Sequence, residues 1–106
     1  MDASLKIILN ELRRCLVELY GDRLARMILF GSRARSDVES GSDVDILVVL
    51  EGPVNPGEEI VQTGPSTAKL SLEYDLVISC TFVSADRFAT EQSPLLLNVR
   101  REGIVV

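Results

Sequence analysis

Two acidic residues separated by a single residue, Asp43 and Asp45, are the part of the sequence best suited to chemistry. An apolar run, residues 46–50, follows them directly and indicates a buried strand. Alternate side chains of a strand share one face, so both carboxylates would point the same way from Cα atoms about 6.6 Å apart. Carboxylates placed in this way can converge on one or two divalent cations, an arrangement used for in-line attack at phosphorus.

A second feature, Gly31-Ser32, follows the apolar residues 27–30 and precedes Asp43 by a ten-residue spacer. Glycine allows the chain to turn sharply and to approach a ligand closely. If Ser32 caps a short helix that begins at Arg33, the free N–H groups at that end would form an anion site. Arg33 and Arg35 could pair with phosphate oxygens or be ordinary surface charges, and the sequence favours neither reading.

Gly31-Ser32, the ten-residue spacer and Asp43-Val44-Asp45 together resemble the G-S-x10-D-x-D motif of the DNA polymerase β-like nucleotidyltransferase superfamily. The short chain and the run from Gly31 to Arg35 resemble its minimal nucleotidyltransferases, and the likeness extends from Leu24 to Val106. The resemblance implies that Gly31, Ser32 and Arg33 hold the triphosphate of a nucleotide. It also implies that Asp43 and Asp45 bind Mg²⁺ and act in catalysis.

The same resemblance implies a third catalytic and metal-binding carboxylate on the strand that follows the crossover. Asp75, in a predicted strand over 74–81, matches that position, and Glu73 is its competitor. Asp75 would bind the catalytic metal and deprotonate or orient the attacking hydroxyl. All-oxygen ligands suit two Mg²⁺ ions, with Mn²⁺ as an alternative.

The reaction that the resemblance implies is nucleotidyl transfer from ATP or another nucleoside triphosphate, with release of pyrophosphate. Larger relatives carry their acceptor site on a second domain, which this chain lacks. The leading prediction is an antitoxin that transfers AMP to a tyrosine of a partner HEPN-type toxin, the role of minimal nucleotidyltransferases. Two alternatives remain: transfer to a small-molecule hydroxyl, and a non-catalytic antitoxin that blocks its partner by contact alone.

Composition places the chain among ordinary globular proteins and narrows its partners. Its 106 residues are 46% hydrophobic and 25% charged, which predicts one domain over 1–106. With no run of 18 apolar residues and no basic-then-apolar leader, we expect a cytoplasmic protein without membrane contact. The absence of histidine excludes a Ser-His-Asp triad and a His-ligated zinc. Residues 36–75 carry one lysine against nine acids, which is unsuited to direct nucleic-acid binding.

The remaining pattern predicts an α/β protein, with a mixed sheet of three to five strands flanked by helices. Strands are expected over 24–30, 43–50 and 74–81. An N-terminal helix, capped by Asp2 or Ser4 and ended by Gly21, carries an apolar stripe for the core: Leu5, Ile8, Leu9, Leu12, Leu16 and Leu19.

Between 58 and 72, Gly64-Pro65 predicts two short helical pieces or a kinked helix, since proline disrupts a helix interior. Ser84 and Ser93 are predicted N-caps of two further helices, the second ending at Gly103. In that second helix Leu95, Leu96 and Leu97 span too wide an arc for one buried stripe. We therefore expect one of them, Leu96 or Leu97 in particular, to face a partner or a second copy. Cys15 and Cys80 are expected to be buried thiols.

Overall fold

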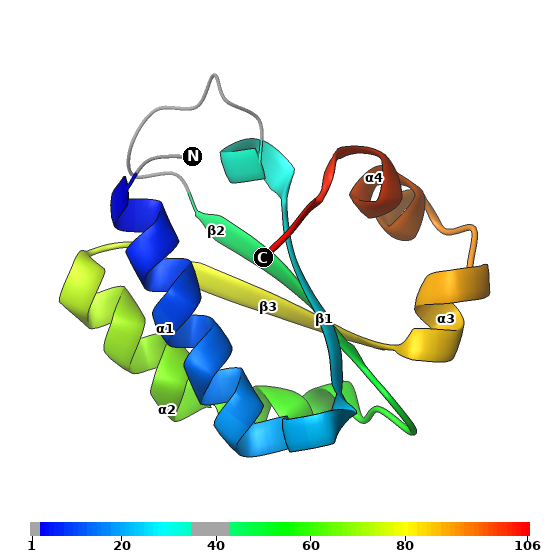
Figure 1. Cartoon of the computed structure of the whole chain (residues 1–106), viewed down its shortest axis with the longest axis horizontal. Helices are drawn as coiled ribbons and strands as arrows, with labels where there is room; N and C mark the ends of the chain where they lie inside the picture. The colour runs from blue at the N-terminus through cyan, green and yellow to red at the C-terminus, as the bar shows by residue number, and fades with distance from the viewer. Residues whose placement is uncertain (1–2, 35–42) are drawn as a thin grey trace.

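The computed structural model describes residues 3–34 and 43–106 and shows a four-stranded mixed sheet with helices against both faces (Figure 1). The strands lie in the order β3-β2-β1-β4. β1 pairs antiparallel with β2 and β4, whereas β2 and β3 are parallel. Their bounds are β1 Leu24–Phe30, β2 Val44–Leu50, β3 Ile78–Ser84 and β4 Ile104–Val105. The predicted α/β class and mixed sheet are confirmed.

Four α-helices and two short 3₁₀ helices connect the strands in the described part of the chain. None of the described helices is long and apolar enough to cross a membrane. Their bounds are α1 Ala3–Tyr20, η1 Gly21–Arg23, η2 Gly31–Ala34, α2 Pro56–Tyr74, α3 Ala85–Thr90 and α4 Pro94–Glu102.

The central strand β2 divides the core into two layers by the alternation of its side chains. Val44, Ile46, Val48 and Leu50 pack with α1 and α2 on one face of the sheet. Leu47 and Val49 pack on the other face, with Leu96 and Val99 of α4 among their neighbours. Because alternate residues share a face, Asp43 and Asp45 belong to the α4 side, and they share that face with Leu47 and Val49.

The predicted stripe of α1 is correct except at its end. Five of its members are buried, but Leu19 is 42% exposed and the neighbouring Tyr20 is buried instead. Tyr20 lies four residues after Leu16 and so continues the same helical face. Its hydroxyl donates a hydrogen bond to Glu59 Oε1, at 3.2 Å, and thereby joins the end of α1 to the start of α2. Ser4 lies inside the helix and does not cap it, and Asp2 lies outside the described residues.

Of the two alternatives predicted around Gly64-Pro65, two separate helical pieces were wrong, because α2 is one helix with Pro65 inside it. Pro65 is exposed, so the carbonyl that loses its partner can bond water. The helix is anchored on its inner side by the buried residues Glu59, Thr63 and Leu70. At its start Asn55 Oδ1 accepts from Glu58 N, and Glu59 Oε2 accepts from Asn55 N. These anchors outweigh the proline penalty of about 3 kcal/mol.

The end of the chain follows the predicted caps. Ser84 Oγ accepts from Arg87 N at the start of α3, and Ser93 Oγ accepts from Leu96 N at the start of α4. Of the two leucines named as candidates to face a partner, Leu96 is buried and is ruled out, whereas Leu97 is exposed. Cys15 and Cys80 are free, partly buried thiols. Burial raises the pKa of Cys80 to about 12, so this thiol stays protonated.

Candidate active site

Asp45 lies near the start of β2, between the end of β1 and the start of β3. Its Cα partners are Phe30 in β1 and Ser79 in β3. Asp43 precedes the strand directly and is exposed, whereas Asp45 is half-buried. The structure therefore brings the two predicted carboxylates together at one end of the sheet, on the face that α4 partly covers.

Gly31 packs against the carboxylate of Asp45 more closely than any other residue type would allow. Its φ is +71°, a left-handed conformation that side chains other than glycine rarely adopt. A Cβ atom at this position would lie 2.5 Å from Asp45 Oδ2 and 3.3 Å from Asp45 Cγ. The glycine of the motif is thus required both by the turn after β1 and by the position of the carboxylate.

Ser32 and Arg33 continue from Gly31 in the 3₁₀ helix η2, which contacts β2 and α4. Both are half-buried, beside the carboxylate end of the sheet. Gly31 thus lies against Asp45, Ser32 and Arg33 follow it in the same short helix, and their binding of a nucleotide stays a prediction. Arg35 and the rest of the ten-residue spacer up to residue 42 lie outside the described residues.

The electrostatics of the pair favour a bound cation. Burial raises the pKa of Asp45 above its usual value, and the nearby charge of Asp43 raises it further. Two carboxylates that repel each other are stabilised when a divalent cation lies between them. Mg²⁺ is commonly held by one or two carboxylates together with substrate phosphates and water. The donor set of Asp43 and Asp45 fits such an ion.

The prediction that strand three begins at Tyr74 was wrong, which changes the position of Asp75. α2 continues to Tyr74, and Asp75 is its left-handed C-cap, with φ of +53°, three residues before β3. Aspartate tolerates this conformation better than most residues. Asp75 is exposed, and Glu73 is exposed in the last turn of α2. Across the described ranges, no three acidic or cysteine side chains gather closely enough to hold a metal ion.

Asp75 nevertheless lies at the same end of the sheet as the carboxylate pair. The carbonyl of Val77, two residues after Asp75, accepts a hydrogen bond from Val44 N at 2.8 Å. Since β2 and β3 are parallel, both strands begin at this end. The role of Asp75 as a third carboxylate remains a prediction, but its position is compatible with it.

Ser79 is a residue that the sequence reasoning did not single out. It is exposed, it is the direct Cα partner of Asp45, and it shares the face of that carboxylate. A strand that began at Tyr74 would place Asp75 and Ser79 on one face, but the sequence alone does not show which residues of β2 they pair with. Only the pairing of β2 with β3 identifies Ser79 as the neighbour of the site.

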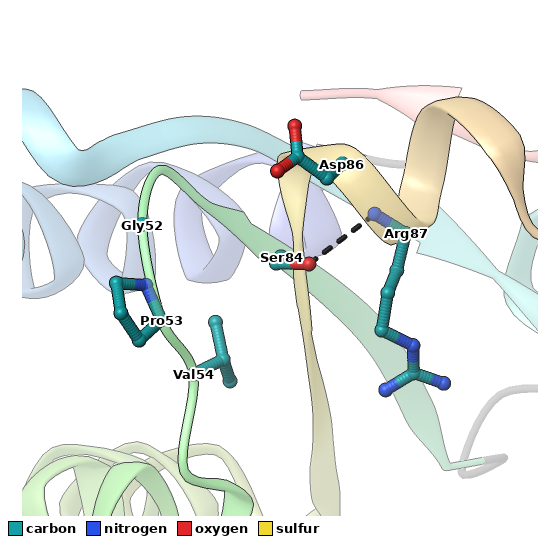
Figure 2. A pocket seen from close by; sticks show the side chains of 6 residues that line it. All are labelled: Gly52, Pro53, Val54, Ser84, Asp86 and Arg87. Carbon is teal, nitrogen blue, oxygen red and sulfur yellow. Dashed lines mark hydrogen bonds between the residues drawn. The ribbon is translucent and has the colours of Figure 1, made fainter.

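A separate hollow of about 340 Å³ lies at the opposite end of β2 and β3 (Figure 2). Gly52, Pro53 and Val54 form one side, and Ser84, Asp86 and Arg87 form the other. Arg87 is paired with Glu91, at 2.9 Å. This hollow contains none of the predicted site residues and lies a strand's length from Asp45.

A comparison with known protein families identifies the family of this chain. Residues 9–96 match the model of the nucleotidyltransferase domain family. This span includes the Gly31-Ser32 turn, both paired aspartates and Asp75. The chain belongs to the nucleotidyltransferase domain family. It is therefore a nucleotidyltransferase.

Two proteins of Methanocaldococcus jannaschii are similar to the chain in sequence, and both carry the name "Putative protein adenylyltransferase". One is 36% identical over 74 residues, which are 68% of this chain and 72% of that protein. The other is 36% identical over 80 residues, which are 76% of this chain and 74% of that protein.

Solved structures similar to this nucleotidyltransferase include a toxin–antitoxin complex with AMP-PNP, at a TM-score of 0.63 and 18% identity. A mutant of the MntA-HpeT toxin–antitoxin complex gives a TM-score of 0.61 and 16% identity. In both, the match covers 91% of this chain and 69% of the other. At these identities the likeness shows the fold, which is that of the polymerase β-like nucleotidyltransferases.

Proposed function

We propose that this nucleotidyltransferase transfers AMP from ATP to a tyrosine hydroxyl of a partner protein, a HEPN-type toxin, and so acts as its antitoxin in the cytoplasm. The observation that carries the proposal is the carboxylate pair, Asp43 and Asp45, with Asp45 packed against Gly31, in a chain of this family. Two relatives named as protein adenylyltransferases support AMP and a protein acceptor. The toxin–antitoxin neighbours support the class of partner.

In the proposed mechanism Asp43 and Asp45 would hold two Mg²⁺ ions, or Mn²⁺ in their place, against the phosphates. Bound there, the cations would neutralise the charge that develops on the phosphate oxygens. Asp43 and Asp45 orient the triphosphate because their negative charges determine where the cations would bind at the end of β2. Gly31 leaves room for this by allowing the turn of η2 to lie directly on Asp45.

The reaction joins the hydroxyl oxygen of the acceptor to the α-phosphorus of ATP and breaks the bond from that phosphorus to the pyrophosphate oxygen. Asp75 takes up or orients the hydroxyl proton, from its exposed position at the end of α2, two residues before the Val77 carbonyl that pairs with Val44. Ser32 and Arg33 contact the triphosphate from η2 and stabilise its charge as pyrophosphate leaves. Catalysis by these residues consists mainly of positioning and charge compensation.

The experiment is co-expression with the product of the neighbouring reading frame, followed by intact-mass spectrometry of that product. The expected result is a gain of one or more adenylyl groups with the wild type, and none with Asp43→Asn combined with Asp45→Asn. A control variant, Asp86→Asn, removes a carboxylate at the far end of the sheet and should leave the modification unchanged.

Two outcomes would contradict the proposal. An unmodified partner that the wild type still neutralises would indicate inhibition by contact alone. A wild type that leaves every protein unmodified but transfers AMP to a small-molecule hydroxyl would place the acceptor in another class.

A further inference from the structure

β3 ends the sheet, and no segment among residues 3–34 and 43–106 pairs with its outer edge. The carbonyl of Val77 points to β2, where it accepts from Val44 N. Main-chain groups of alternate residues point to opposite sides of a strand, so those of Ser79, Thr81 and Val83 also point to β2. Those of Ile78, Cys80 and Phe82 consequently point to the outer edge.

This edge lacks the features that usually prevent strand pairing. Exposed edges are commonly protected by proline, by lysine or other charges, or by bulges. The seven residues of β3, Ile78–Ser84, include no proline and no charged residue, and they pair with β2 without a break in register. An unprotected edge of this length is suited to pairing with an added strand.

Two adjoining hollows follow the edge and would receive side chains of such a strand. One, of about 270 Å³, lies between β3 and the middle of α2, beside Thr63, Gly64 and Thr67. The other, of about 320 Å³, extends from the start of α2 to Leu95 and Leu96 of α4. Both are bordered by Ile60, Cys80 and Phe82, so they form one continuous groove, defined here as the β3 groove. Ile60, 56% exposed, and Leu95, 39% exposed, give the walls an apolar part, and the ion pair of Arg87 with Glu91 borders the hollow near α4.

One residue of the β3 groove, Ser79, lies beside the carboxylate site. Ser79 borders the groove and is also the Cα partner of Asp45. Neighbouring strands lie about 4.8 Å apart, so a strand added to β3 would run about 10 Å from β2. A residue of that strand lying beside Ser79 would present its side chain on the face that carries Asp45. A tyrosine side chain spans most of this separation, and the phosphates of ATP would span the rest.

We propose that the β3 groove binds an extended segment of the acceptor protein as a fifth strand, through main-chain hydrogen bonds to Ile78, Cys80 and Phe82. This segment carries the hydroxyl that is modified. The inference rests on the proposed function and adds how the acceptor is recognised. Recognition of this kind selects an extended backbone, since the pairing uses main-chain groups and β3 itself carries no charge.

The first experiment uses a library of short extended peptides, each with one central tyrosine, and measures AMP transfer by mass spectrometry with the full chain, ATP and Mg²⁺. A peptide that is modified is then made with N-methyl groups on one set of alternate residues or on the other. Methylation of the set that faces β3 should abolish transfer, and methylation of the other set should not. The inference is wrong if neither methylated peptide loses transfer, or if both lose it equally.

The second experiment alters the groove and measures the KM for the same peptide. Cys80→Pro removes an edge-facing N–H that β2 does not use, and Ile60→Asp places a charge in the groove wall. Each should raise KM roughly tenfold, the factor given by about 1.4 kcal/mol. Val61→Asp is the matched control, because Val61 is 76% exposed on the same helix and does not border the groove. If Cys80→Pro fails to fold, Ile60→Asp and Val61→Asp decide the question.

ATP binding in the presence of Mg²⁺, measured on the same samples, separates this inference from the proposed function. A wild type that transfers AMP to no peptide and to no co-expressed partner would refute the proposed function itself. A wild type that transfers AMP, with groove variants of unchanged KM, would refute only the β3 groove. Light scattering tests whether a second copy of the chain occupies the β3 edge. If the wild type is a dimer and Cys80→Pro makes it a monomer with unchanged AMP transfer, the edge binds a second copy and not the acceptor.

Discussion

Gly31→Ala tests whether the glycine of the motif exists to accommodate the carboxylate of Asp45. The new Cβ would lie 2.5 Å from Asp45 Oδ2, so the carboxylate must move. A left-handed conformation costs a non-glycine residue about 1–2 kcal/mol. Displacing the half-buried carboxylate from its rotamer costs a further ~1 kcal/mol. The expected loss in the free energy of unfolding is therefore about 2–3 kcal/mol.

A double-mutant cycle separates the two contributions. In an Asp45→Ala background the nearest atom of residue 45 would be its Cβ, at 3.5 Å, which is an ordinary contact. Gly31→Ala should then cost only the backbone contribution, so the coupling between the two positions should be about 1 kcal/mol. The free energies come from urea denaturation of all four proteins in EDTA, so that metal binding does not contribute.

If Gly31→Ala costs the same free energy in both backgrounds, the glycine serves the turn alone and does not hold the carboxylate. Gly52→Ala is the matched control, because Gly52 also has a positive φ, of +81°, but its Cβ would meet no atom within 4 Å. Its cost should equal the backbone contribution seen at Gly31 in the Asp45→Ala background.

Three further predictions concern single groups. Burial and Asp43 raise the pKa of Asp45 above 3.8, so the folded protein holds that proton more tightly, and stability falls as pH rises from 3.8 through the folded pKa. Asp45→Asn should therefore raise the Tm at pH 7 in EDTA. A gain in Tm that persists at pH 3 would contradict this. Tyr20→Phe leaves the buried Glu59 without one hydrogen bond and should lower the free energy of unfolding, measured by urea denaturation, by about 1.5–3 kcal/mol. Burial and Glu59 raise the pKa of Tyr20 to about 12, so the stability of the wild type should fall between pH 10 and 12. The variant should not show that fall. Asp75→Asn should lower kcat for AMP transfer at least tenfold with ATP binding retained, whereas Glu73→Gln should leave kcat within about twofold, and the reverse pattern would identify Glu73 as the third carboxylate.

The sequence was sufficient to predict the part of the site that depends on local periodicity. The apolar run before Gly31 and the alternation after Asp43 predicted β1, β2 and the shared face of the two aspartates, because each pattern continues through a whole strand. The region before β3 was not predicted for a tertiary reason. Pro65 suggested a broken helix, but it lies on the exposed side of α2.

The wrong prediction for the start of β3, at Tyr74 and not at Ile78, has the same tertiary origin. α2 extends to Tyr74, so Asp75 becomes a helix cap and Ser79 becomes the neighbour of Asp45. An aspartate before an apolar run is compatible with a strand start and with a left-handed cap, and only the contacts of α2 distinguish the two. Likewise, the burial of Leu96 between its exposed neighbours Leu95 and Leu97 depends on how α4 is oriented on the sheet.

The central claim is that Asp43 and Asp45 bind the nucleotide through divalent cations. Isothermal titration calorimetry with ATP tests it most directly, in Mg²⁺ and in EDTA, on the wild type and on Asp43→Asn combined with Asp45→Asn. The account predicts binding by the wild type in Mg²⁺ only, and none by the folded double variant under either condition. Equal affinity of the wild type in Mg²⁺ and in EDTA would contradict it.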